Sequence, residues 1–145
     1  MNSPREVLDF WFDGVSREDD GDAVGLENAF GRWFGGGEAF DREIRERFGA
    51  LTETALGGGL ADWEDDIHSR LALVLVLDQF PRNVFRGTAR AFAGDERALR
   101  LSRDAVAGGN DRHLALIERF FLLMPYQHAE DRKTQQEGLR LFEDL

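Results

Sequence analysis

The sequence lacks several features that define large classes of protein. It contains no cysteine among its 145 residues, which excludes disulfide bonds and thiolate metal ligands. Its longest apolar run, Leu71–Leu77, is far too short to cross a bilayer, which requires about 20 apolar residues. The first residues lack the basic segment and apolar run of a secretory signal. We therefore predict a cytoplasmic protein that is neither exported nor inserted into a membrane.

Positive charge is also scarce. The chain has 18 Lys and Arg against 28 Asp and Glu, which gives a net charge of -10. The basic residues are scattered among carboxylates and form no patch or stripe, and so acidic a chain repels phosphate backbones. We therefore expect no nucleic-acid partner. A basic or amphipathic peptide is the partner that this charge favours.

The sequence shows no pattern typical of a cofactor or metal site. The glycine runs Gly35–Gly37 and Gly57–Gly59 follow helical segments, where they end helices, and do not form a phosphate loop after a strand. No two histidines have the spacing of metal ligands. The acidic loop from Ser16 to Glu27 places oxygens at several calcium-loop positions, but Ser16 stands where aspartate is needed. We interpret it as a solvated loop and predict no cofactor and no metal.

Apolar residues recur with helical spacing along most of the chain. Ser3-Pro4-Arg5-Glu6 is a capping box with proline at the first helical position. The segment 67–80 is apolar nearly all round, as expected of a central buried helix. Expected helices cover residues 4–12, 27–34, 38–56, 67–80, 95–107, 111–124 and a final segment ending near Leu145. In this scheme Asp95 and Asp111 cap helices.

The pattern predicts one all-α domain over residues 1–145. Pro81 and Pro125 are each expected to end a helix, and the triplet Leu-Ala-Leu precedes both of them. This weak repeat favours stacked helix hairpins. The tryptophans and most phenylalanines take core-like positions, and we favour a core over the alternative of an aromatic ligand groove.

Six motifs spread over nearly the whole chain resemble those of a known family. They are Val7–Phe12, Arg32–Phe34, Arg70–Leu73, Leu77–Gly87, Ala91–Asp95 and Met124–Asp131. Through them the chain resembles domain of unknown function 924, an uncharacterised and mainly bacterial family. The resemblance implies an all-helical, tetratricopeptide-like superhelix, and it implies no established activity.

The resemblance also implies a longer pattern than this chain contains. Members of the family continue with another helix and a second segment similar to Phe-Pro-His-Arg-Asn, so a C-terminal part of the pattern is expected to be missing. Its loss would leave Leu139, Phe142 and Leu145 partly exposed on the final helix. We therefore expect a homodimer formed through that helix.

Polar side chains gather where the central helix meets Pro81. Asp78 and Gln79 precede this proline, and Arg82, Asn83 and Arg86 follow it. One interpretation is a pocket for a small anion, because guanidinium groups suit carboxylate or phosphate. The other is structural, with Arg82 or Arg86 paired to Asp78 and with Asn83 capping the next turn. We favour the structural interpretation.

A second polar corner follows Pro125. His128, Glu130 and Asp131 lie together there. An imidazole with two carboxylates suits a hard divalent ion or general acid–base chemistry. The alternative, which we favour, is that the two acids complement the positive end of the last helix and that His128 is a surface residue.

Two functions follow from these patterns. The first is a protein or peptide interaction module, in which stacked hairpins form a concave, acidic face. The alternative is an enzyme, with hydrolysis as one possible reaction, whose site combines Asp78, Arg82, Asn83, His128 and Glu130. One geometric observation distinguishes the two functions. The enzyme requires His128 to lie within hydrogen-bond reach of a carboxylate, in a cleft beside Arg82.

Overall fold

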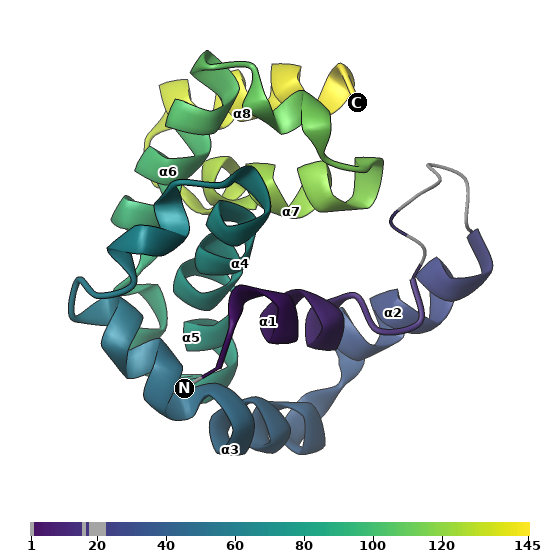
Figure 1. Ribbon diagram of the computed structural model, residues 1–145, viewed down its shortest axis with the longest axis vertical. Helices are drawn as coiled ribbons and strands as arrows, with labels where there is room; N and C mark the ends of the chain where they lie inside the picture. Colours follow the sequence, from purple (N-terminus) through teal and green to yellow (C-terminus); the bar gives the residue numbers. More distant parts are fainter. Residues whose placement is uncertain (1, 16, 18–22) are drawn as a thin grey trace.

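The computed structural model describes residues 2–15, 17 and 23–145 (Figure 1). Its elements are α1 (Pro4–Trp11), α2 (Ala23–Gly35), α3 (Gly37–Leu56), η1 (Ala61–Glu64), α4 (Ile67–Asp78), α5 (Phe80–Val84), η2 (Ala89–Phe92), α6 (Asp95–Ala107), η3 (Asn110–His113), α7 (Leu116–His128) and α8 (Arg132–Glu143). No strand occurs in these residues, which confirms the all-α prediction. Residues 16 and 18–22 of the acidic loop considered as a calcium site lie outside the described residues.

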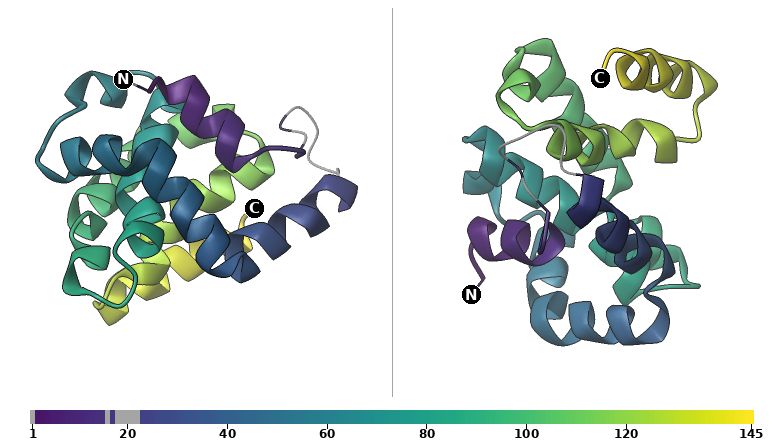
Figure 2. Two further views of the ribbon diagram at one scale, coloured as in Figure 1. Left: turned by 90° about the horizontal axis from the view of Figure 1, so that it is seen from below. Right: turned by 90° about the vertical axis from the view of Figure 1, so that its right-hand side faces the viewer.

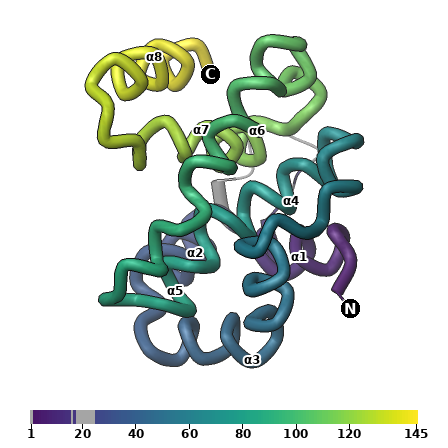
Figure 3. The backbone as a smooth tube through the Cα atoms, turned by 90° about the vertical axis from the view of Figure 1, so that its left-hand side faces the viewer, coloured from purple at the N-terminus to yellow at the C-terminus, as the bar shows by residue number. Residues whose placement is uncertain are grey.

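The central helix occupies the position that its composition predicts. Leu71–Leu77 are all buried in α4, which contacts α1, α3, α6 and α7 (Figure 3). The fully buried part of this helix has no solvent-facing side, which explains why it lacks the polar stripe of a surface helix. The last residue of α4, Asp78, is buried with the leucines and valines that precede it.

Of the three helix caps predicted from the sequence, one is confirmed and two are wrong. The capping box at α1 is confirmed, since the Ser3 hydroxyl accepts from the Glu6 amide at 3.2 Å and the Glu6 carboxylate accepts from the Ser3 amide at 3.4 Å. The caps predicted at Asp95 and Asp111 are wrong. Gly94 precedes α6 and Asp95 is its first residue, while Asp111 lies in η3 and α7 begins only at Leu116.

The physical reason at α6 is a close approach between backbones. A Cβ atom at Gly94 would overlap the main chain of Leu77 at the end of α4, so only glycine fits between the two helices. The Asp95 side chain, one residue later, does not cap the helix, and its carboxylate binds Arg82.

The two prolines have different effects. The central helix ends before Pro81, as predicted, and the short α5 carries this proline in its first turn. The prediction that Pro125 ends a helix is wrong, because α7 continues through it to His128. Phe121 and Tyr126, on either side of Pro125, are both buried, so core packing holds the helix together where proline removes a backbone donor. His128 therefore ends α7 and does not open the last helix.

Helices α6, α7 and α8 follow one another as packed neighbours at one end of the molecule (Figure 2). This arrangement is consistent with stacked helix hairpins. On α8, Leu139 is 53% exposed and Phe142 is partly exposed, as expected, and the homodimer through this helix stays a prediction. Among the described residues, no helix has both the length and the apolar character that crossing a bilayer would require.

Candidate functional site

The site is centred on Asp78, whose side chain is 0% exposed. Its Oδ1 atom lies 2.7 Å from Nδ1 of His128, and its Oδ2 atom accepts a hydrogen bond from the Gln79 side-chain amide at 3.0 Å. A carboxylate in its ionised form can only accept, and with Asp78 in that form Nδ1 carries the proton of the first bond. The first corner of the sequence therefore meets the second, through a bond between residues fifty positions apart.

His128 stands at the boundary of two cavities. Its side chain is 21% exposed and lines both of them. In the neutral ring with its proton on Nδ1, the other nitrogen, Nε2, has a free lone pair, and within the described part of the chain it makes no hydrogen bond. The sequence-based interpretation of His128 as an ordinary surface residue does not account for its bond to a fully buried carboxylate.

Arg82 also reaches Asp78, but its principal partner is Asp95. Its two terminal nitrogens bind the two Asp95 oxygens at 2.8 and 3.0 Å, and one of them also donates to the Asp78 carbonyl at 2.6 Å. The distance to the Asp78 carboxylate is 3.5 Å. The ring of Phe92 covers the guanidinium, 5.3 Å from the carbon at its centre. Arg82 thus joins α5 to the start of α6.

A second buried carboxylate, Asp41 of α3, was missed by the sequence analysis. It accepts from the Asn83 amide at 2.8 Å and from Arg86 at 2.7 and 2.9 Å. Of the two arginines predicted as partners of Asp78, Arg82 lies within ion-pair distance of it and Arg86 binds Asp41 instead. The prediction that Asn83 caps the next turn is wrong, because its side-chain amide also binds Asp41. A signal was present, since Asp41 lies on the same helical stripe as Ile44 and Phe48 and is the acidic residue of that buried face.

The Asp41 cluster has defined protonation. Hydrogen bonding from Arg86 holds the pKa of the Asp41 carboxyl below its usual value, and burial, which acts in the opposite direction, is the smaller effect. The same bond raises the pKa of the Arg86 guanidinium. Both groups are therefore charged near neutral pH and form a persistent ion pair at the edge of the site.

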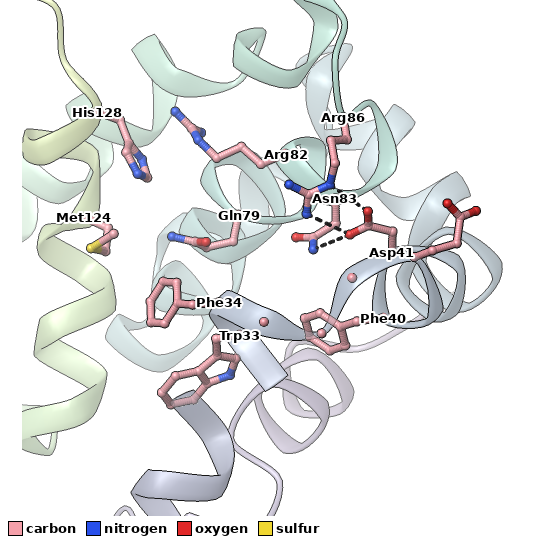
Figure 4. A pocket seen from close by; sticks show the side chains of 14 residues that line it. Trp33, Phe34, Phe40, Asp41, Gln79, Arg82, Asn83, Arg86, Met124 and His128 are labelled. Atoms are coloured by element: carbon pink, nitrogen blue, oxygen red, sulfur yellow. Dashed lines mark hydrogen bonds and ion pairs between the residues drawn. The ribbon is translucent and has the colours of Figure 1, made fainter. Parts of the chain in front are cut away.

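The Asp41 cluster, Arg82 and His128 line a cavity of about 560 Å³, called the pocket below (Figure 4), whereas Asp78 and Asp95 do not line it. Its polar residues are Glu38, Asp41, Gln79, Arg82, Asn83, Arg86 and His128, and its apolar residues are Trp33, Phe34, Phe40 and Met124. The size falls within the roughly 300–1,000 Å³ that small-molecule sites occupy. Trp33 and Phe40 are buried, as the core prediction requires, but their accessible edges also contribute to the pocket, together with the exposed Phe34.

The remaining residues of the second corner lie outside the pocket. Glu130 is exposed and lines the neighbouring cavity, and the fully buried Asp78 lines neither cavity, so the residues predicted to form one combined site do not surround one space. Asp131 accepts from the backbone amide of Thr134 at 3.0 Å and caps α8. Hydrogen bonds from the Thr134 hydroxyl and amide hold the pKa of Asp131 below its usual value. In the described part of the chain, no group of three or more acidic or imidazole side chains is arranged to hold a metal ion.

Two comparisons place the chain among known proteins. A model of the family described as "Bacterial protein of unknown function (DUF924)" matches residues 7–145. A protein of unknown function from Agrobacterium tumefaciens, ATU0120, has a similar solved structure, with a TM-score of 0.81 and 33% sequence identity. The similarity covers 97% of this chain and 72% of that one. No curated protein matches. The family match extends to residue 145, and it does not support the expectation of a missing C-terminal part.

Proposed function

Because the chain belongs to the bacterial family of unknown function DUF924, whose description names no activity, we propose a function from the site itself. The protein binds a small molecule in the pocket and exchanges a proton with it through His128. Hydrolysis is the reaction class that such a group most directly serves, because the imidazole can remove a proton from an attacking water.

One observation carries the proposal. The His128 Nδ1 atom lies 2.7 Å from a carboxylate that is itself 0% exposed, while the same ring lines the pocket. A buried carboxylate on Nδ1 fixes the tautomer, orients the ring and stabilises the imidazolium that forms when Nε2 takes a proton. Asp78 is in this scheme a positioning residue, and His128 is the residue that contacts the substrate.

The charges of the pocket favour a ligand without net charge. Arg82 is bound by Asp95, and Arg86 is bound by Asp41. Each guanidinium is thus neutralised by a carboxylate, which argues against the small anion considered from the sequence. Trp33, Phe34 and Met124 provide an apolar surface opposite this polar wall, so the expected ligand has an apolar part and a polar bond that reaches His128.

The proposal is tested by assaying the purified protein on a panel of chromogenic esters, amides and phosphoesters. For any substrate that is turned over, His128→Gln is expected to lower kcat/KM by at least ~100-fold, the usual contribution of general acid–base catalysis. His113→Gln is the matched control, because His113 is exposed in η3 and lines neither cavity. Wild-type turnover by His128→Gln, or no turnover of any panel member by the wild-type protein, would contradict the proposal.

A second candidate is the interaction module expected from the sequence. It is supported by the cavity that adjoins the pocket at Arg82 and His128, since this cavity carries an exposed aromatic ring, Phe92. Aromatic side chains, phenylalanine included, are enriched at the cores of protein interfaces.

A further inference from the structure

A groove of about 720 Å³ lies on the other side of Arg82 and His128 from the pocket. Its walls come from η2 and the first turns of α6 on one side, and from the corner between α7 and α8 on the other. We call it the acidic groove and define it by Phe92, Asp95, Glu96, Leu99, Pro125 and Glu130.

The groove has an apolar anchor. The Phe92 side chain is 60% exposed, although its ring covers the guanidinium of Arg82. Leu99 and Pro125 add apolar surface nearby. An aromatic ring held in place by a cation beneath it, with one face open, loses little conformational freedom when a ligand packs on it.

The acidic groups of the groove differ in whether they are paired. Asp95 binds Arg82, and Asp131 caps α8. Glu96 on α6 and Glu130 beyond α7 are exposed, and among the described residues neither makes an ion pair or a side-chain hydrogen bond. The groove therefore carries two unneutralised carboxylates on its opposite walls, which is the complement of a ligand with at least two positive charges.

We infer that the acidic groove binds a basic, amphipathic peptide segment of a partner protein. Basic side chains pair with Glu96 and Glu130, and an apolar side chain packs on Phe92. A further cavity, of about 860 Å³, shares Glu96, Leu99, Asp131 and Thr134 with the groove. Arg97, Arg100 and Arg103 line that cavity, so the basic residues of the peptide are confined to the groove itself. The inference rests on the second candidate function and does not depend on proton transfer by His128.

The test measures fluorescence anisotropy of labelled peptides with the full-length protein at physiological salt. The probe is a short peptide of alternating lysine and leucine, and the comparison peptide alternates glutamate and leucine. The lysine peptide is expected to bind and the glutamate peptide is not. The double variant Glu96→Gln/Glu130→Gln, and separately Phe92→Ala, should each weaken binding about tenfold, which corresponds to about 1.4 kcal/mol.

A control separates the groove from the net charge of -10. Glu27→Gln/Glu46→Gln removes the same two charges from exposed positions on α2 and α3, and it should bind the lysine peptide like the wild type. Equal weakening by both double variants would overturn the inference, as would unchanged binding to the groove variants or no binding of the lysine peptide. Turnover assays on the variant Glu96→Gln/Glu130→Gln report the proton-transfer function separately, because neither residue lines the pocket.

Discussion

At the residue scale, the site depends on one buried carboxylate that serves several partners. Asp78 holds His128 and Gln79 by direct hydrogen bonds and lies within ion-pair distance of Arg82. A buried carboxylate requires such partners, because an unpaired charge away from water is costly. The same bonds that make its burial possible also fix the orientation of the imidazole.

The first prediction concerns the tautomer of His128. Asp78→Asn replaces an acceptor by a group that can donate to Nδ1, so the ring proton is expected to move to Nε2. Nitrogen chemical shifts of the imidazole, measured by proton–nitrogen NMR, should report this exchange. Turnover should fall with it, and the free energy of unfolding should fall by about 1–3 kcal/mol because a buried hydrogen-bond network is disturbed. An unchanged Nδ1–H tautomer in the variant would refute this assignment.

The second prediction concerns the ion pair between Asp41 and Arg86. The pKa of Asp41 is lower in the folded protein than its ordinary value, chiefly because of the hydrogen bond from Arg86. Because its pKa is lowered on folding, the ionised Asp41 adds to the free energy of unfolding at any pH above its unfolded-state pKa. This contribution is lost as the pH falls through the folded-state pKa. Asp41→Asn should therefore be less stable than the wild type near neutral pH, and the difference should shrink below about pH 4. Urea unfolding across this range measures it, and a difference that grew with acidification would show the sign to be wrong.

The residues of the site were predictable, but most of their partners were not. Asp78, Arg82 and His128 could be selected because each lies beside a proline, where a buried helix meets polar sequence. Arg82 binds Asp95 of α6, and Asn83 and Arg86 bind Asp41 of α3. The packing of helices that are distant in sequence decides which carboxylate neutralises each arginine. The local spacing of residues contains no information on these pairings.

At the element scale, the position of His128 depends on how closely α7 packs on α8. Gly138 of α8 is buried against Tyr126 of α7, and a Cβ atom at Gly138 would overlap the Tyr126 side chain. The environment of Tyr126 is dry enough that burial raises its pKa to about 12. Glycine is therefore required for contact between the two helices, despite its low helix propensity.

The third prediction follows from this contact. Gly138→Ala should lower the free energy of unfolding by about 1–3 kcal/mol, because the overlap outweighs the gain of about 1 kcal/mol in helix propensity. Gly31→Ala in α2 is the matched control, since no atom lies near its Cβ position, and it should be neutral or stabilising. Chemical denaturation of the three proteins measures both effects. Gly138→Ala as stable as the control would mean that α8 can move away from α7 at little cost.

Helix boundaries show where local sequence was sufficient and where it was not. The start of α1 is set by Ser3 and Glu6, which are neighbours in sequence, so it was predicted correctly. The end of α7 was not, because the buried residues around Pro125 keep the helix intact beyond it. The strength of that packing depends on α4 and α8, and it is a tertiary property.

At the scale of the whole molecule, the all-α architecture was readable from periodicity alone, since most helices carry one apolar stripe or, in α4, apolar residues all round. Association between molecules is a separate question. The exposed Leu139 lies on α8, which packs mainly against α7 at one end of the molecule. A second copy of the chain would cover this surface.

The fourth prediction is accordingly a homodimer through α8. Light scattering at high micromolar concentration should give twice the mass of the chain, and Leu139→Lys should return the protein to a monomer without loss of helix content by circular dichroism. The substitution replaces an exposed side chain, so the fold itself should tolerate it. A wild-type protein that remains monomeric under these conditions would rule out the dimer.

The wall formed by Arg82 and His128 belongs to the pocket and to the acidic groove at once. A ligand on one side that moves this pair of side chains also changes the shape of the site on the other side. Thermodynamic linkage then requires reciprocity: whatever factor a peptide in the groove imposes on the affinity for a small molecule in the pocket, the small molecule imposes on the affinity for the peptide. If both proposals hold, a peptide bound in the groove would change the concentration of small molecule needed to fill the pocket, and the small molecule would change how long the peptide stays bound.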